Sequence, residues 1–101
     1  MNDRIQIAKE FAESINSDYI KQIILFGSVA RGDDKEFSDI DILIISDNAK
    51  EIEDEIMDIA FEIVLDKQEV ISPHIASKSN LNKIEDFSFM KNIERDGIVL
   101  I

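Results

Sequence analysis

The sequence predicts a small α/β sandwich, in which a mixed sheet of three or four strands carries helices on one side and a functional site on the other. Two apolar runs, at 23–26 and 42–45, are typical of strands buried on both faces. Two longer segments, at 3–16 and 50–65, repeat their apolar residues with the period of an α-helix. A chain of 101 residues can bury one modest core, so we expect a single domain over 1–101.

Composition limits the class of protein. Apolar residues make up 45% of the chain, which is typical of a folded protein and argues against disorder. The sequence has no apolar run of transmembrane length and no apolar stretch near its start that would form a signal peptide. It also has no cysteine, which excludes disulfides, thiolate metal sites and a cysteine nucleophile. We therefore expect a cytoplasmic protein without a membrane anchor.

The charge is strongly negative, with 11 Lys and Arg against 22 Asp and Glu and a net charge of −11. Such a field repels a phosphate backbone, so we expect no broad nucleic-acid binding. It favours docking on a basic partner. Acidity that serves only solubility explains the composition equally well.

The first helix and the first strand follow from local patterns. Asn2 or Asp3 is a suitable N-cap for the helix at 3–16. Its apolar face is expected to hold Ile5, Ala8, Phe11, Ala12 and Ile15. Polar residues at 16–18 interrupt the helical pattern, and the first strand is expected at 19–26.

The second helix, at 50–65, has one apolar face and one acidic face. The apolar face holds Ile52, Ile56, Ile59, Ala60 and Ile63. The acidic face holds Glu51, Glu53, Asp54, Glu55 and Asp58. Such a run of charges is usually a solvated surface, and its alternative use is to dock a basic partner.

The last third of the chain continues the alternation of strands and helices. A third strand is expected at 69–76, and at an edge of the sheet because Pro73 cannot donate to a ladder. A polar connection at 77–82 leads to a helix at 87–95. A final strand at 98–101 needs a neighbouring strand or a partner chain to cover it.

The residues that carry chemistry lie between the two apolar runs. Asp39 and Asp41 open the second run, and side chains alternate along a strand, so both carboxylates point the same way. Their Cα atoms are expected roughly 6.5–7 Å apart. Two carboxylates at this distance can converge on one or two divalent cations.

A glycine-serine turn directly after the first apolar run indicates a phosphate site. Gly27 has no Cβ, so a ligand can approach the backbone there. The residues from Ser28 to Arg31 are expected to open a helix, whose free N–H groups favour a phosphate. The Ser28 hydroxyl can donate a further hydrogen bond. Mg²⁺ held by Asp39 and Asp41 would bridge and neutralise a triphosphate.

The motif G-S-V-A-R-G at 27–32, followed by S-D-I-D at 38–41, resembles the signature of the DNA polymerase β-like nucleotidyltransferase superfamily. The small size makes the chain most similar to the minimal nucleotidyltransferases, the MntA-like antitoxin group. The resemblance implies that AMP is transferred from ATP to a hydroxyl with Mg²⁺. For this group it also implies an antitoxin that adenylylates a tyrosine of a HEPN-domain ribonuclease toxin.

Two cations near the motif have two possible uses. In the family the loop at 32–38 lies near the triphosphate, so Arg31 and Lys35 would reach phosphate oxygens. The alternative is that they pair with acidic residues of the loop, which contributes little to stability. We favour surface pairs for Lys35 and leave both uses open for Arg31.

The third strand departs from the family pattern. The superfamily commonly has a third carboxylate there, often as the general base. This strand has Ser72 and His74 on one face, and Glu69 at its start is expected to lie too far away. His74 is the only histidine and is a candidate base near neutral pH. A structural or simply exposed histidine is the alternative.

Three functions are consistent with these observations. The first is an enzyme that transfers AMP to a protein partner. The second is a weak or inactive member of the family that neutralises a basic partner by docking through the helix at 50–65. The third is an enzyme for a small molecule, with its acceptor pocket at the interface of a homo-oligomer. The missing third carboxylate favours docking, and the intact aspartate pair favours chemistry.

Overall fold

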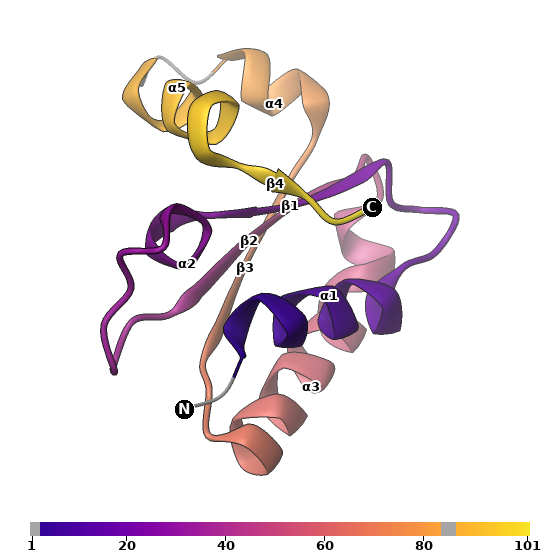
Figure 1. Cartoon of the computed structure of the whole chain (residues 1–101). Coiled ribbons are helices and arrows are strands. Elements are labelled where there is room, and N and C mark those ends of the chain that lie inside the picture. The colour runs from indigo at the N-terminus through magenta and orange to yellow at the C-terminus, as the bar shows by residue number, and fades with distance from the viewer. Residues whose placement is uncertain (1–2, 84–86) are drawn as a thin grey trace.

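The computed structural model describes residues 3–83 and 87–101 and contains a four-stranded mixed sheet with helices (Figure 1). In chain order the elements are α1 (Arg4–Ile15), β1 (Gln22–Phe26), α2 (Gly27–Arg31), β2 (Ile40–Ile45), α3 (Ala49–Lys67), β3 (Ile71–Ala76), α4 (Lys78–Lys83), α5 (Phe87–Asp96) and β4 (Ile98–Val99). The predicted fold class is confirmed.

The strands lie in the order β3-β2-β1-β4. β1 is antiparallel to both β2 and β4, whereas β2 and β3 are parallel. The two strands that flank the motif are therefore central, as predicted. β3, which contains Pro73, forms one edge, also as predicted. The C-terminal strand β4 finds its neighbour within the chain, since it pairs with β1.

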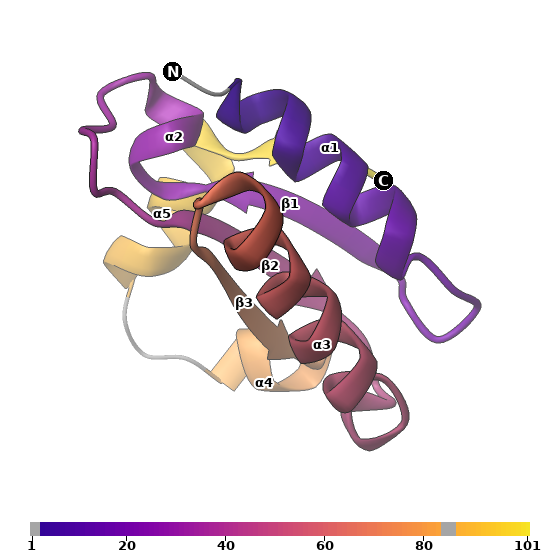
Figure 2. The ribbon, with the colours of Figure 1, turned by 90° about the horizontal axis from the view of Figure 1, so that it is seen from below.

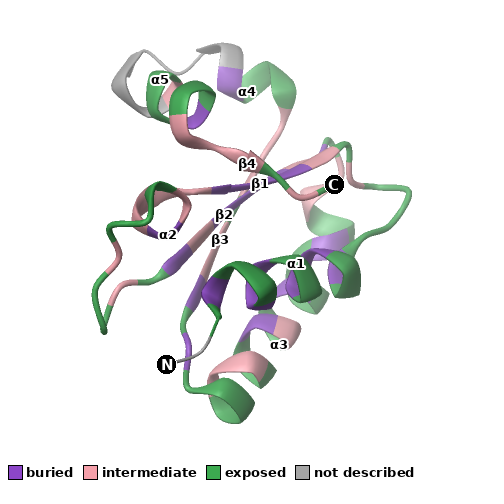
Figure 3. Cartoon of the chain, viewed as in Figure 1, coloured by how far each residue is buried: buried purple, intermediate pink, exposed green. Residues whose placement is uncertain are grey.

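The main core lies between the sheet and the helices α1 and α3. Figure 2 shows these two helices side by side across one face of the sheet. The face is formed by alternate strand residues, and its buried members include Ile23, Leu25, Ile40, Ile42 and Ile44. Buried and half-buried positions on both helices turn toward these strands (Figure 3). The apolar face predicted for the second helix is confirmed.

A second, smaller core lies on the opposite face. Ile24 and Leu43 of the central strands are buried there against Leu81 of α4 and Ile93 of α5. The expectation that helices cover only one side is therefore wrong. The reason is that the apolar runs of β1 and β2 bury both faces, so the second face also needs a cover.

Two local expectations are corrected. The first strand begins at Gln22 instead of residue 19, because residues 17–20 form a turn closed by a bond from Ile20 N–H to the Ser17 carbonyl. On α1, Ile5 is 37% exposed, and Arg4 lies on the buried face instead. The predicted N-cap Asp3 is confirmed, since its carboxylate accepts from the Gln6 N–H. Among the described residues, no helix is both long and apolar enough to cross a membrane.

Candidate active site

The candidate site lies where β1 ends and β2 begins. In the sheet register Asp41 stands between Phe26 of β1 and Ser72 of β3. Paired residues in neighbouring strands point to the same face. Asp41 is two residues from Leu43, so it shares the face covered by α4 and α5. The site therefore occupies the end of the second face, where Asp41 keeps 30% of its side chain exposed.

Asp39 lies beside Asp41 on this face. The Ser72 hydroxyl donates a hydrogen bond of 2.9 Å to Asp39 Oδ2, and Ser72 is also the residue that pairs with Asp41. The two aspartates are therefore held against the same serine of the edge strand. This arrangement agrees with the alternation expected from the sequence.

Gly27 is the residue that the local backbone requires most strictly. Its φ of +78° is rarely adopted by residues with a side chain. A Cβ at this position would overlap Asp41 Oδ2. The turn after β1 therefore packs directly against one of the two carboxylates. Gly27 begins the helix α2, which is only five residues long because Gly32 ends it in a left-handed conformation with φ +79°.

His74 reaches the same site from β3. Its Nε2 lies 3.6 Å from Asp41 Oδ1, which is too long for a hydrogen bond and close enough for an ionic attraction when the ring is protonated. Its ring contacts Phe26 at a centroid distance of 5.3 Å. The side chain is 48% exposed, so it is also accessible to a ligand.

The surroundings of Asp41 raise the pKa of its carboxyl group. Partial burial, which disfavours the charged carboxylate, is the main cause. His74 acts in the opposite direction, and the negative charge of Asp39 adds to the increase in pKa. Since this carboxylate pair lacks a full compensating charge from the protein, a bound cation would stabilise it.

The donor set fits Mg²⁺. Asp39 and Asp41 offer only carboxylate oxygens, the ligands that Mg²⁺ prefers. Among the described residues, no group of three or more His, Asp or Glu side chains is placed to hold a metal. Mg²⁺ usually binds through one or two carboxylates and completes its shell with water and phosphate oxygens. Two aspartates next to a candidate phosphate turn match that pattern.

The two cations of the motif have different surroundings. Arg31 Nε lies 3.2 Å from Asp33 Oδ2 in an exposed pair. In the part of the chain that the structure describes, the Lys35 ammonium forms no ion pair with acidic residues of the loop. The surface pair that we favoured for Lys35 is therefore wrong. It is Arg31 that forms a surface pair, with Asp33.

Arg4 is a residue that sequence reasoning missed. Its guanidinium is 6% exposed and forms ion pairs with Glu69 (2.8 Å) and Asp34 (2.7 Å). It also donates to the carbonyls of Lys35 and Glu36, which belong to the loop before Asp39. The helical period was a possible signal, because position 4 lies four residues before Ala8 on the buried face of α1.

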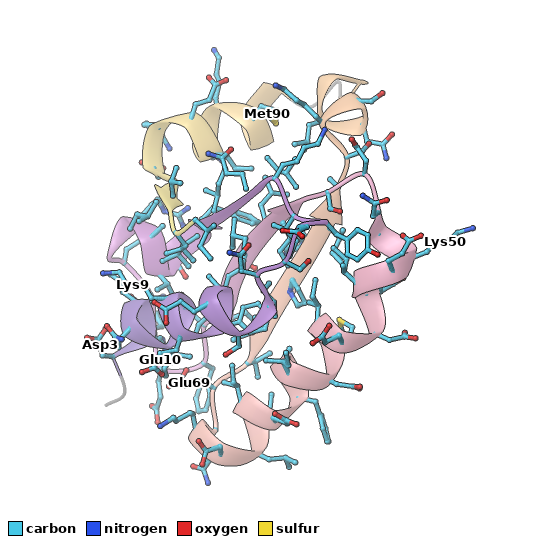
Figure 4. The ribbon with its side chains drawn as sticks, turned by 90° about the vertical axis from the view of Figure 1, so that its right-hand side faces the viewer. Asp3, Lys9, Glu10, Lys50, Glu69 and Met90 are labelled. Carbon is cyan, nitrogen blue, oxygen red and sulfur yellow. The ribbon has the colours of Figure 1, made fainter. Side chains whose placement is uncertain are left out.

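These contacts also explain why Glu69 does not serve as the third carboxylate of the site. Glu69 is 8% exposed and is held by Arg4, on the side of the sheet that faces α1. Figure 4 shows Glu69 next to the first turns of α1, whereas Met90 lies across the sheet on α5. Glu69 thus precedes β3 but is engaged away from the aspartate pair.

Known proteins resemble this chain in sequence. The sequence matches the nucleotidyltransferase domain family over residues 5–100. The chain belongs to this family. A protein of Methanocaldococcus jannaschii with a provisional assignment as a protein adenylyltransferase is 42% identical over 103 residues, covering 99% of both chains. As a member of the family, the chain is a nucleotidyltransferase.

Solved structures of toxin–antitoxin proteins have the same fold. One is a toxin–antitoxin crystallised with AMP-PNP. The alignment covers 100% of this chain and 73% of the chain in that structure, at 17% identity and a TM-score of 0.58. Another is a mutant form of the MntA–HpeT toxin–antitoxin, at 16% identity, with the same coverage and a TM-score of 0.58. These likenesses show that the chain has the fold found in these toxin–antitoxin structures.

Proposed function

We propose that this protein is an antitoxin that transfers AMP from ATP, with Mg²⁺, to a tyrosine hydroxyl of a HEPN-type toxin. The observation that carries the proposal is the contact between the Gly27 turn and Asp41. It joins a candidate phosphate site to a candidate metal site. The relative assigned as a protein adenylyltransferase supports a protein acceptor, and the toxin–antitoxin neighbours support a toxin as that acceptor. The HEPN class and the tyrosine come from the resemblance of the motif.

Each site residue has a proposed role. The backbone of Gly27 and the hydroxyl of Ser28 hold phosphate oxygens of ATP. Asp39 and Asp41 hold the metal, which when bound neutralises phosphate charge. Arg31 lies at the end of α2 and exchanges its exposed partner Asp33 for a phosphate oxygen, because an exposed pair is weak.

The proposed reaction is balanced without another reagent. The acceptor oxygen forms a bond to the α-phosphorus of ATP, and the bond from that phosphorus to pyrophosphate breaks. The proton of the acceptor hydroxyl must leave, and His74 is the proposed base. A histidine suits this role near neutral pH, and its Nε2 lies 3.6 Å from Asp41 Oδ1.

The test is the mass of the toxin after incubation with this protein, ATP and Mg²⁺. We expect intact-mass spectrometry to detect one added AMP on the HEPN-type protein, mapped to a tyrosine by peptide sequencing. The addition should require ATP and Mg²⁺, and it should disappear with Asp39→Ala/Asp41→Ala. An unmodified toxin in the presence of wild-type protein would rule out the reaction.

A second candidate function is inhibition by docking alone, with little or no catalysis. It is favoured by the outer face of α3, where Glu51, Asp54 and Asp58 are all exposed. If docking suffices, the double aspartate variant should still neutralise the toxin. Reversing charges on α3, with Asp54→Lys/Asp58→Lys, should then abolish neutralisation. The reaction proposed above predicts the opposite result for each pair of substitutions.

A further inference from the structure

The loop that precedes Asp39 is held in one shape by buried contacts. Arg4 donates to the Asp34 carboxylate and to the carbonyls of Lys35 and Glu36, at 2.5–2.7 Å. Three consecutive residues of the loop are thus fixed to the start of α1. A loop fixed in this way loses little entropy when it binds a partner.

A tight turn closes the end of this loop. The Lys35 N–H donates to the Ser38 hydroxyl at 2.8 Å, and the Ser38 N–H donates to the Lys35 carbonyl at 3.0 Å. The turn therefore encloses residues 36 and 37 and ends at Ser38, directly before Asp39. Figure 1 shows this segment between α2 and β2, extending beyond the end of the sheet.

Phe37 lies in this turn with 91% of its side chain exposed. An aromatic side chain gains most of its interaction energy from burial, so a fixed turn that presents one to water is a typical binding anchor. Val70, 47% exposed, lies at the same end of the sheet, because its carbonyl accepts from the Ile40 N–H. Two exposed apolar side chains thus lie at the end of the sheet that carries Asp39.

The surroundings of Phe37 decide what kind of partner fits. At 91% exposure almost no wall of this protein flanks the ring, whereas a nucleotide base is usually enclosed by its site. The charges next to Phe37 are mixed, because Asp33 pairs with Arg31 and the exposed Lys35 lies beside the exposed Glu36. The repulsion of a second copy comes instead from the net charge of the whole chain, which is −11. A basic protein surface with an apolar pocket is complementary in both respects.

We propose that Phe37 is the docking anchor for the acceptor protein. It enters an apolar pocket of the acceptor rimmed by Lys or Arg, and this contact brings the acceptor hydroxyl to Asp39 and Asp41. The inference rests on the proposed function, because it names how the acceptor of that reaction is recognised. Phe37 is a specificity residue and takes no part in the chemical step.

The test compares two serine substitutions of exposed phenylalanines. Phe37→Ser removes the anchor, and Phe61→Ser on α3, where the ring is 62% exposed, is the matched control. The separately purified HEPN-type protein serves as the acceptor. We expect Phe37→Ser to raise both the Kd and the KM for the acceptor protein by about tenfold or more. The KM for ATP and the melting temperature should not change, and Phe61→Ser should behave as the wild type.

Other results would overturn the inference. Unchanged acceptor binding by Phe37→Ser would do so. Equal losses in both variants would also do so, because the effect would then not be specific to Phe37. A higher KM for ATP alone would assign Phe37 to the nucleotide. Failure of the proposed function is recognised separately: the wild type would then bind the acceptor in a Phe37-dependent way without transferring AMP. A wild type that does not bind the acceptor would overturn the inference itself.

Discussion

Two acidic clusters lie at the start of β2 and β3, and they differ in where their positive charge comes from. Around Arg4, the carboxylates of Asp34 and Glu69 have a cation supplied by the chain and are largely buried. Around Gly27, the carboxylates of Asp39 and Asp41 are more exposed. There His74 lies 3.6 Å from Asp41, and the charge of Arg31 also lowers the pKa of that carboxylate.

The difference teaches how to separate structural from functional acids in a chain with a net charge of −11. Buried charges that are paired and hydrogen-bonded belong to the fold. A partly exposed pair of carboxylates, in which the pKa of Asp41 is raised, is a candidate for binding an external cation. The first cluster holds the loop, and the second, directly after that loop, is the candidate site.

The largest effect on stability is expected from removing the cation of the first cluster. Arg4→Ala leaves Asp34 and Glu69 without their partner and should lower the free energy of unfolding by about 3–5 kcal/mol. For a domain of this size the melting temperature should then fall by more than ten degrees. Arg31→Ala, which breaks only an exposed pair, should change stability by less than about 0.5 kcal/mol. If Arg4→Ala and Arg31→Ala lowered the melting temperature by similar amounts in thermal unfolding, the predicted difference between the two arginines would be wrong.

Removing charge from the two clusters should separate activity from stability. Asp39→Asn and Asp41→Asn should each lower the rate of AMP transfer about a hundredfold or more, with little effect on melting temperature. Glu69→Gln should do the reverse, costing about 1–3 kcal/mol of stability while the folded fraction keeps its activity. Rates measured per folded molecule test this. A hundredfold loss of rate in Glu69→Gln would place Glu69 in the site.

Two glycines with the same backbone angle isolate the contact with Asp41. Gly27→Ala and Gly32→Ala both place a side chain at φ near +78°, which costs about 1–3 kcal/mol each. Only at Gly27 would the new Cβ overlap Asp41, since the space around Gly32 is open. We expect calorimetry to detect loss of Mg²⁺-ATP binding in Gly27→Ala alone. Equal binding by both variants would argue against the Gly27 turn as part of the site.

The smallest expected effect is the pH dependence of the second cluster without metal. The pKa of Asp41 is raised in the folded state above its usual 3.8, so the charged carboxylate slightly destabilises the fold at neutral pH. Asp41→Asn should therefore be more stable than the wild type by a fraction of a kcal/mol. As the pH falls through the raised pKa to below 3.8, the wild type takes up its proton and the difference should vanish. Denaturant unfolding at several pH values measures this. If the difference in stability between Asp41→Asn and the wild type widened in acid, the pKa of Asp41 would be lowered in the folded state instead of raised.

Local patterns of the sequence determined where the main helices and strands form and how the residues of the motif are spaced along them. Continuous apolar runs predicted central strands, Pro73 predicted an edge strand, and alternation predicted that Asp39 and Asp41 share a face. These features depend on residues a few positions apart, whose spacing is fixed by the geometry of a strand or helix. The chemistry of the candidate site was therefore visible before the fold.

The tertiary structure decided which charges meet. Arg4 and Glu69 are 65 positions apart, and no local pattern connects them. Their pairing takes Glu69 away from the aspartates and fixes the loop that exposes Phe37. The cover of α4 and α5 over the second face was also decided by packing, as was the contact between Gly27 and Asp41. Such contacts depend on how twisted strands and helices come together, and spacing along the chain does not encode them.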